Sequence, residues 1–387
     1  MRPLTIAILA GEPSGDNLGA PLIRAIKAKH PDARFVGIGG AAMIREGLES
    51  WVDMERLSVN GFVDPIKRLP ELYRILMTTR DRVVAEAPDC FVGVDFNFFN
   101  LLLERMLRNR GVKTVHYVSP TVWAWRKWRI RSIAKSVDLM LALYPFETGV
   151  YEENGIDVAF VGHPKADEID PSPVDKRLPR EQLGLPADAP VVAVLPGSRG
   201  SEVAYTGPDF LNAAVLIAEA MPDARFVIPS ANEKRKAQLE EMVARLESNI
   251  SVAILDGDAM RAMQAADVVL VNSGTATLEA MLLKKPMVMS YRLGAMTYAI
   301  VSRLVTTPYF ALPNILARRA LVPELIQDRA TPEALSAAVL DLLRQDGHDA
   351  LFAEFDRIHT SLRRDAAASA AEAILSRFAP ETHGAAD

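Results

Sequence analysis

The stretch that most constrains the fold runs from residue 268 to residue 288 and reads VVLVNSGTATLEAMLLKKPMV. Its first residues, Val268–Val271, are typical of a buried parallel strand, and Ala276–Leu283 has helical spacing. A turn of small residues joins them: Asn272, Ser273, Gly274 and Thr275. This order predicts one strand–turn–helix unit of a parallel α/β sheet.

The turn is also suited to an anion. Free N–H groups at the start of a helix favour negative charge, and Gly274 lets a ligand approach without a Cβ in the way. Glu279 follows one turn into the helix, where it could accept hydrogen bonds from sugar hydroxyls. A helix capped by Ser or Thr occurs in any α/β domain, so the turn alone leaves both interpretations open.

Similar apolar runs recur along the chain between helical patterns. They are Leu4–Ala10, Ala33–Ile38, Cys90–Val94, 113–118, Asp138–Tyr144, Ala159–Val161, Val191–Leu195, Arg225–Pro229, Ser251–Leu255 and the run that ends at Tyr291 and Arg292. Strands that alternate with helices predict an α/β protein built from doubly wound, Rossmann-like domains.

With 387 residues the chain exceeds one ordinary core, and we expect two domains. Residues 1–164 are predicted to form the first domain, the proline-rich residues 165–190 a linker, and residues 191–345 the second domain. Residues 346–387 have a helical pattern and then a loose tail. Their helices could cross back to the first domain or exchange with a second copy of the chain.

Composition excludes several classes of protein. The net charge of −5 gives no basic field for nucleic acid, and the single Cys90 rules out an internal disulfide framework and a CxxC metal site. No apolar run reaches the ~18 residues of a transmembrane helix, and the apolar start of the chain is shorter than that of a signal peptide. These features predict a cytoplasmic protein and leave attachment to a membrane surface open.

Two loops that follow strands carry candidate site residues. The loop after the first strand, 11–16, lacks the GxGxxG spacing, and its Glu12 and Asp16 repel phosphate, which favours a sugar or acceptor site over a dinucleotide. The loop after Val191–Leu195 has the opposite charge, because Gly197 and Ser198 lead into Arg199. That loop suits a diphosphate.

Carboxylates elsewhere allow further interpretations. Asp95 follows the strand Cys90–Val94, and the carboxyl end of a parallel strand is where α/β folds bind ligands, so Asp95 is the candidate general base. Asp256 and Asp258 have the spacing of a metal-binding pair, but we favour a helix cap for them. His116 and His163 follow strands singly and are interpreted as structural.

Two segments combine apolar and basic residues. Residues 60–77 place apolar side chains on one helical face, and Pro65 and Pro70 predict two short helices there. This face could join the core or form a patch that contacts membrane or acyl chains; the patch residues would be Phe62, Val63, Ile66, Leu69 and Leu72. The second segment interleaves Arg and Lys with Trp123, Trp125 and Trp128, which favours a lipid–water interface over stacking on nucleic acid bases.

Seven ordered motifs together resemble those of lipid-A-disaccharide synthases. They are AGEPSGD (10–16), HYVSPTVWAWR (116–126), FVGHP (160–164), LPGSRGSEV (195–203), SGTATLE (273–279), KPMVMSYR (285–292) and LPN (312–314). The resemblance covers residues 4 to 375. It implies the B-type glycosyltransferase fold, in which two Rossmann-like domains face a cleft.

The same resemblance implies a reaction and its site. 2,3-Diacylglucosamine would pass from its UDP conjugate to the 6-hydroxyl of 2,3-diacylglucosamine 1-phosphate, with inversion and without a metal or cofactor. Asp95 would be the catalytic carboxylate. On the donor side Arg199 and the turn 273–275 would hold the diphosphate, Glu279 the ribose and Asn314 the nucleotide. The acceptor would lie near Ser14, Gly15 and Asp16. A peripheral position on the cytoplasmic face of the inner membrane and a homodimer through the C-terminal helices are further expectations.

One position departs from the family pattern. The family has Asp-x-Pro-Asp-Phe-Asn after the strand, whereas this chain has Asp95, Phe96, Asn97, Phe98, Phe99 and Asn100. Phe98 therefore replaces a carboxylate on the acceptor side. Alternative functions are the transferase that makes the peptidoglycan lipid precursor, a UDP-N-acetylglucosamine 2-epimerase, and a nucleotide-sugar-binding protein without catalysis.

Overall fold

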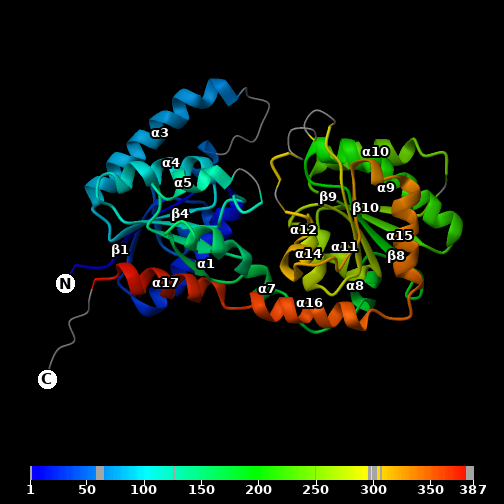
Figure 1. Cartoon of the computed structure of the whole chain (residues 1–387). Coiled ribbons are helices and arrows are strands. Elements are labelled where there is room, and N and C mark those ends of the chain that lie inside the picture. The colour runs from blue at the N-terminus through cyan, green and yellow to red at the C-terminus, as the bar shows by residue number, and fades with distance from the viewer. Residues whose placement is uncertain are drawn as a thin grey trace. The chain divides into compact units, whose positions relative to one another are not determined.

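The computed structural model describes residues 2–57, 65–124, 127–248, 250–294, 298, 303–305 and 307–380. The chain divides into two compact units, Met1–Asp167 with Leu362–Asp387, and Glu168–Ser361 (Figure 1). Residues 168–190, predicted as part of a linker, belong to the second unit in this division, as do residues 346–361.

The first unit contains a parallel sheet of seven strands in the order β3-β2-β1-β4-β5-β6-β7. The strands are β1 Thr5–Ala10, β2 Arg34–Ile38, β3 Leu48–Ser50, β4 Cys90–Val94, β5 Thr114–Tyr117, β6 Leu139–Ala142 and β7 Asp157–Phe160. The strand order reverses between β1 and β4. In a doubly wound sheet, ligands bind outside the carboxyl ends of the strands at this switch point.

The second unit repeats the design with six parallel strands in the order β10-β9-β8-β11-β12-β13. They are β8 Val191–Leu195, β9 Arg225–Ser230, β10 Val252–Asp256, β11 Val268–Asn272, β12 Met287–Tyr291 and β13 Glu324–Ile326. Here the switch point lies between β8 and β11. The predicted α/β class with two Rossmann-like domains is confirmed.

Helices connect the strands in both units. They are α1 Pro13–Lys29, α2 Ala41–Arg45, α3 Pro65–Glu86, α4 Asn97–Arg108, α5 Ile130–Ile133, α6 Thr148–Glu152, α7 Pro164–Glu168, α8 Arg177–Gln182, α9 Gly200–Ala220, α10 Glu233–Ala244, α11 Ala259–Ala265, α12 Thr275–Leu282, α14 Leu312–Ala317, α15 Pro332–Arg344, α16 Asp349–Leu362 and α17 Ala366–Phe378. Four short 3₁₀ helices are also described: η1 Met54–Arg56, η2 Lys127–Arg129, η3 Pro145–Glu147 and η4 Gln327–Arg329. No helix in the described part of the chain is long and apolar enough to cross a membrane.

Two helices differ from the prediction. α1 begins at Pro13, so most of the predicted loop 11–16 is its first turn; proline is favoured there because its fixed φ suits a helix start. α3 is one helix from Pro65 to Glu86 rather than two short ones. Pro70 lies close to its start, so it removes only the bond to the carbonyl of residue 66 and the helix continues.

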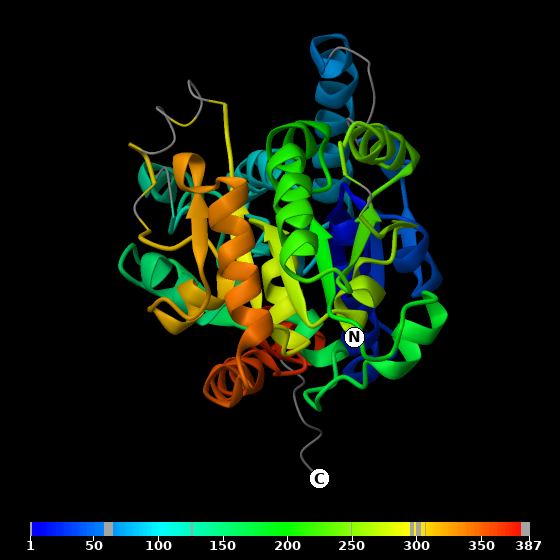
Figure 2. The same cartoon turned by 90° about the vertical axis from the view of Figure 1, so that its right-hand side faces the viewer.

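Each sheet is covered by helices whose apolar faces complete its core. In the first unit α17 packs beside α1, with Ala370 and Ile374 buried in the core (Figure 1). In the second unit α9 and α15 lie against each other over the sheet (Figure 2), where Phe210 and Leu335 are buried. Covering both faces explains why the strands are continuous apolar runs.

Candidate active site

Asp95 lies at the switch point of the first sheet, directly after β4. Asp95 and Phe96 have φ angles of 51° and 48°, in the left-handed region that non-glycine residues rarely adopt. Such residues cost about 1–3 kcal/mol each and persist where the surroundings hold them. The Ser14 hydroxyl donates to Asp95 Oδ2 at 3.2 Å, and Asn97 Nδ2 donates to Oδ1 at 3.4 Å. The carboxylate is half-buried, so it is oriented and still accessible.

Buried polar residues lie behind this turn. Asn100 Nδ2 donates to the carbonyls of Val94 at 3.3 Å and Asp95 at 2.8 Å, which holds the unusual backbone. Glu104 Oε1 lies 2.7 Å from His116 Nδ1, and both side chains are fully buried. Burial raises the pKa of Glu104, against the opposing effect of His116.

Of the three predicted acceptor residues, only Ser14 reaches Asp95. Asp16 is 6% exposed, and its carboxylate accepts hydrogen bonds from the amides of Gly40, Ala42 and Met43 at 2.9, 2.9 and 3.0 Å. It holds the start of α2, so the structure does not support a direct contact between this carboxylate and the acceptor. Gly15 allows close packing, because a Cβ there would lie 3.0 Å from the carbonyl oxygen of Val94.

A cavity of about 460 Å³ lies at the switch point of the second sheet. The loop after β8 and the turn after β11 meet there, so the structure brings together the predicted residues Gly197, Ser198, Arg199, Ser273, Gly274 and Thr275. Gly197 and Gly274 have φ angles of 125° and 145°, which only glycine adopts without strain. The first turn of α12 adds N–H groups that lack partners within the helix.

Glu202 gives this cavity an electrostatic feature that the sequence interpretation missed. Its Oε2 accepts hydrogen bonds from the amides of Ser198 and Arg199 at 3.0 and 3.1 Å, and its Oε1 lies 3.0 Å from Arg199 Nη1. The Arg199 side chain is 81% exposed. The loop amides and Arg199 thus already bind one carboxylate, which shows that they can hold an anion. Glu202 is the third residue of α9, and a Glu at this position commonly accepts from the N-cap amide, so the sequence could have identified this contact.

Two predicted donor residues do not line this cavity. Asn314 is 1% exposed and uses its amide inside the unit: Nδ2 donates to Val322 O and Glu324 Oε1, and Oδ1 accepts from the amides of Leu321 and Val322. Its amide, at the start of α14, is therefore already bound within the unit, and the structure does not support the expected contact with the nucleotide. Glu279 is half-buried on α12, outside the lining of the cavity.

The Asp256 and Asp258 pair was interpreted as a helix cap rather than a metal site. Asp258 is the N-cap of α11, and its Oδ1 accepts from the amide of Arg261 at 3.1 Å. The cap is therefore present at Asp258, whereas Asp256 caps no helix: its Oδ2 accepts from Lys236 Nζ at 2.9 Å. Among the described residues, no group of three or more His, Cys, Asp and Glu side chains could hold a metal ion.

The predicted apolar patch is only partly described. Phe62, Val63 and Trp125, and the side chain of Ile66, lie outside the described residues. Leu72 packs partly buried against the core, whereas Leu69 and Trp128 are 57% and 61% exposed. Trp123 packs edge-on against Phe146 with ring centroids 4.6 Å apart. Phe98, the departure from the family pattern, is 85% exposed.

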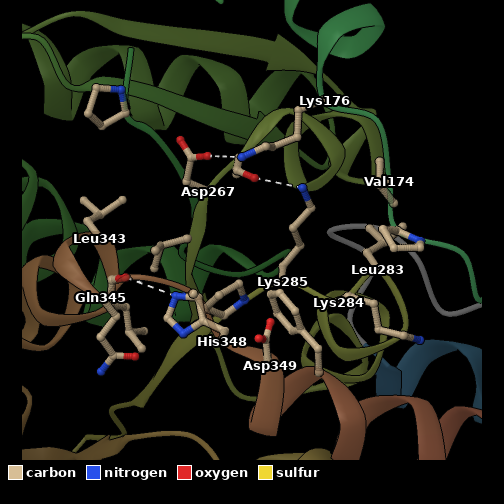
Figure 3. A pocket seen from close by; sticks show the side chains of 18 of the residues that line it. Val174, Lys176, Asp267, Leu283, Lys284, Lys285, Leu343, Gln345, His348 and Asp349 are labelled. Atoms are coloured by element: carbon tan, nitrogen blue, oxygen red, sulfur yellow. Dashed lines mark hydrogen bonds and ion pairs between the residues drawn. The ribbon is translucent and has the colours of Figure 1, made fainter. Parts of the chain in front are cut away.

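A larger cavity of about 630 Å³ lies at the opposite, amino-terminal edge of the second sheet (Figure 3). Its cations are bound by protein groups. Lys176 pairs with Asp267, and Lys285 Nζ donates to the carbonyls of Gln264 and Ala266 at 2.8 Å each. Burial lowers the pKa of Lys285 to about 7. Because doubly wound sheets bind ligands outside the carboxyl ends of their strands, we favour the cavity at the switch point over this one for the diphosphate.

The polar residues behind Asp95 were not among the predicted site residues. Asn97, Asn100 and Glu104 recur at helical spacing along α4, so they share one face of the helix. This polar stripe, beside the buried apolar residues Phe99, Leu103 and Leu107 of the same helix, is the signal that could have identified them.

Known proteins of one family match this chain over nearly its whole length. The family model described as lipid-A-disaccharide synthetase matches residues 6–375. The lipid-A-disaccharide synthase of Pseudomonas syringae pv. tomato is 50% identical over 374 residues, covering 97% of each chain. That of Pseudomonas savastanoi pv. phaseolicola is 51% identical over 375 residues, again covering 97% of each.

Solved structures agree on the fold. The crystal structure of UDP-GlcNAc 2-epimerase from Neisseria meningitidis bound to UDP-GlcNAc has a TM-score of 0.63, covers 97% of this chain and 100% of that chain, and is 14% identical in sequence. At that identity the likeness shows the fold alone. The family match and the relatives at half identity go further: this chain belongs to the lipid-A-disaccharide synthetase family.

Proposed function

We propose that this chain is an inverting glycosyltransferase that makes the lipid A disaccharide. It transfers 2,3-diacylglucosamine from UDP-2,3-diacylglucosamine to the 6-hydroxyl of 2,3-diacylglucosamine 1-phosphate, giving the β-1,6-linked disaccharide 1-phosphate and UDP. The observation that carries this proposal is the oriented, accessible carboxylate of Asp95 at one switch point, in a chain of this family. The Arg199 cavity at the other switch point supports it.

Each unit supplies one part of the chemistry. The acceptor 6-hydroxyl oxygen attacks the anomeric carbon of the donor, and its proton passes to Asp95 as general base. The bond from the anomeric carbon to the diphosphate breaks as the new bond forms, so the configuration inverts and UDP leaves with the electron pair. Arg199 and the amides at the start of α12 stabilise the negative charge that develops on the diphosphate.

A single-turnover assay with both substrates, read by mass spectrometry of the disaccharide, tests this proposal. Wild type should form the disaccharide and Asp95→Asn almost none. Asp53→Asn is the matched control, because it removes an exposed carboxylate that only caps η1 in the same unit. Wild-type turnover by Asp95→Asn would exclude the general base. UDP binding without product in the wild type would favour a nucleotide-sugar-binding protein.

The acyl chains of both substrates suggest a role for exposed apolar residues. Leu69 and Tyr73 on α3 are 57% and 63% exposed, Phe98 on the adjacent α4 is 85% exposed, and all three offer apolar contact to acyl chains at a peripheral membrane surface. Phe98→Asp and Leu69→Glu should reduce sedimentation with anionic vesicles that contain acceptor. Leu178→Glu, at an equally exposed leucine of the second unit, is the control. Unchanged sedimentation of the first two variants would exclude this surface.

A homodimer formed by exchange of α17 remains part of the proposal. The face of α17 that packs on α1 is buried within the first unit, so an exchanged helix would bury the same residues on a second copy. Light scattering coupled to size exclusion measures the mass directly, and a monomer at assay concentrations would exclude the exchange.

A further inference from the structure

Glu104 and His116 form a fully buried pair of titratable side chains that the proposed chemistry does not use. Both are 0% exposed, and Glu104 Oε1 lies 2.7 Å from His116 Nδ1. Room for the pair is built into β4: a Cβ at Gly93 would lie 2.2 Å from Glu104 Oε1. Burying such groups is costly, and apolar residues of similar volume often stabilise a core as well or better. We therefore looked for a functional role of the Glu104–His116 pair.

The other side of His116 leads to the catalytic carboxylate. His116 Nε2 lies 3.1 Å from Asn97 Oδ1, and Asn97 Nδ2 lies 3.4 Å from Asp95 Oδ1. A continuous line of polar contacts thus runs from a buried carboxylate on α4, through β5 and the first residue of α4, to the turn after β4.

Chemistry fixes the direction of each contact. The Asp95 carboxylate only accepts, so the amide nitrogen of Asn97 faces it and the amide oxygen faces His116. His116 Nε2 must then carry a proton to donate to that oxygen. One further proton lies between His116 Nδ1 and Glu104, and it holds the imidazole in this orientation.

We propose that Glu104, His116 and Asn97 are positioning residues that fix the carboxylate of Asp95 for proton abstraction. Glu104 orients the imidazole, the imidazole orients the Asn97 amide, and that amide binds Oδ1. The Ser14 hydroxyl holds Oδ2 from the other side, so the carboxylate plane is fixed at both oxygens. The inference rests on the proposed function, because it assigns these residues to the base of that reaction.

Two substitutions of His116 separate positioning from simple packing. The amide nitrogen of His116→Gln reaches the place of Nε2 and keeps the contact to Asn97, whereas that of His116→Asn reaches only the place of Nδ1 and keeps the contact to Glu104. We expect kcat to fall about 10- to 100-fold in His116→Asn and Asn97→Ala, the range seen for residues that orient metal ligands in other proteins. KM for both substrates should stay within about twofold, and His116→Gln should retain more of kcat than His116→Asn.

Thr114→Val is the matched control. Thr114 lies on the same strand as His116, is also 0% exposed, and donates to the carbonyl of Ser136 at 2.8 Å without a link to Asp95. Its kcat should be that of wild type even if its melting temperature falls. Equal kcat in His116→Asn and His116→Gln, or losses that follow melting temperature across all variants including Thr114→Val, would overturn the positioning role.

Two further outcomes also test the positioning role: a variant that does not fold, and a wild type that forms no product. If His116→Asn does not fold, Asn97→Ala settles the matter, because Asn97 is half-buried and its removal leaves the Glu104–His116 pair intact. If the wild type forms no disaccharide, the proposed function fails. Crystal structures of wild type and Asn97→Ala then test the positioning alone, and an unchanged Asp95 rotamer in the variant would overturn it.

Discussion

The Ser14 hydroxyl, in the first turn of α1, donates a hydrogen bond of 3.2 Å to Oδ2 of Asp95. It joins the loops after β1 and β4, the two strands that flank the switch point of the first sheet. Since a hydrogen bond contributes about 1 kcal/mol net, Ser14→Ala should lower kcat/KM by roughly fivefold. Steady-state kinetics measure this, with Ser132→Ala on α5 as an exposed-serine control. An unchanged kcat/KM would mean that Asn97 and the turn orient Asp95 without Ser14.

Asp16 should behave as a structural residue. Its two oxygens accept three backbone N–H groups at the start of α2, and Asn would place an NH₂ group against one of them. We expect Asp16→Asn to lower the free energy of unfolding by about 1–3 kcal/mol, while kcat of the folded enzyme changes little. Urea unfolding and kinetics on the same sample test this. A large loss of kcat at full stability would return Asp16 to the acceptor site.

Asn314 should also contribute to stability rather than to nucleotide affinity. Its amide makes four hydrogen bonds to groups between Leu321 and Glu324, which tie α14 to β13. Losing several bonds of about 1 kcal/mol each predicts that Asn314→Ala costs roughly 3 kcal/mol or more in unfolding free energy. UDP affinity of the folded fraction, measured by calorimetry, should be unchanged. Weaker UDP binding at wild-type stability would contradict this assignment.

Arg199 should act mainly in the transition state, where charge moves onto the diphosphate. Removing a comparable charge-stabilising donor costs about 2.7–4 kcal/mol, so Arg199→Met should lower kcat by roughly 10²- to 10³-fold. Arg245→Met is a closely matched control: its side chain is 75% exposed against 81% for Arg199, and each arginine pairs with a glutamate in the second unit. A similar small effect in both variants would show that Arg199 does not contact the diphosphate.

The strands were the most predictable part of this fold. Parallel strands buried on both faces are continuous apolar runs, and Cys90–Val94 and Val191–Leu195 were predicted to the residue. The short edge strands β3 and β13 were missed, because three residues at an edge carry no periodic signal.

The loops at the two switch points could be predicted from the sequence. The hydrogen-bond partners of the individual site residues could not. Asp95 and Arg199 follow strands, so their position is a property of the topology. Whether Asp16 meets a ligand or the amides of α2 depends on a segment more than twenty residues away, as the 26-residue separation from Ala42 shows. The Asn314 amide likewise binds groups that follow it in the chain, Leu321, Val322 and Glu324, and its position in the sequence does not show these contacts.

Glu147 makes stability depend on pH in an unusual direction. It is 3% exposed, and its Oε2 accepts from the amides of Leu143 and Tyr144 at 3.1 and 3.0 Å. Burial outweighs these hydrogen bonds and raises the pKa of Glu147 from 4.5 to about 8. Between these values the folded protein holds a proton that the unfolded chain has released. The contribution of Glu147 to stability is therefore full below pH 4.5 and is lost as pH rises toward 8.

Glu147→Gln isolates this effect, because glutamine keeps the acceptor oxygen and cannot titrate. The difference in unfolding free energy, wild type minus variant, should fall by up to about 1.4 kcal/mol per pH unit across that window. Urea denaturation of both proteins at pH 5, 6.5 and 8 gives this difference. The contributions of all other titrating groups are the same in both proteins and cancel in the difference. Parallel stability curves for the two proteins would mean that Glu147 is ionised in the folded state, with its two backbone donors outweighing the cost of burial.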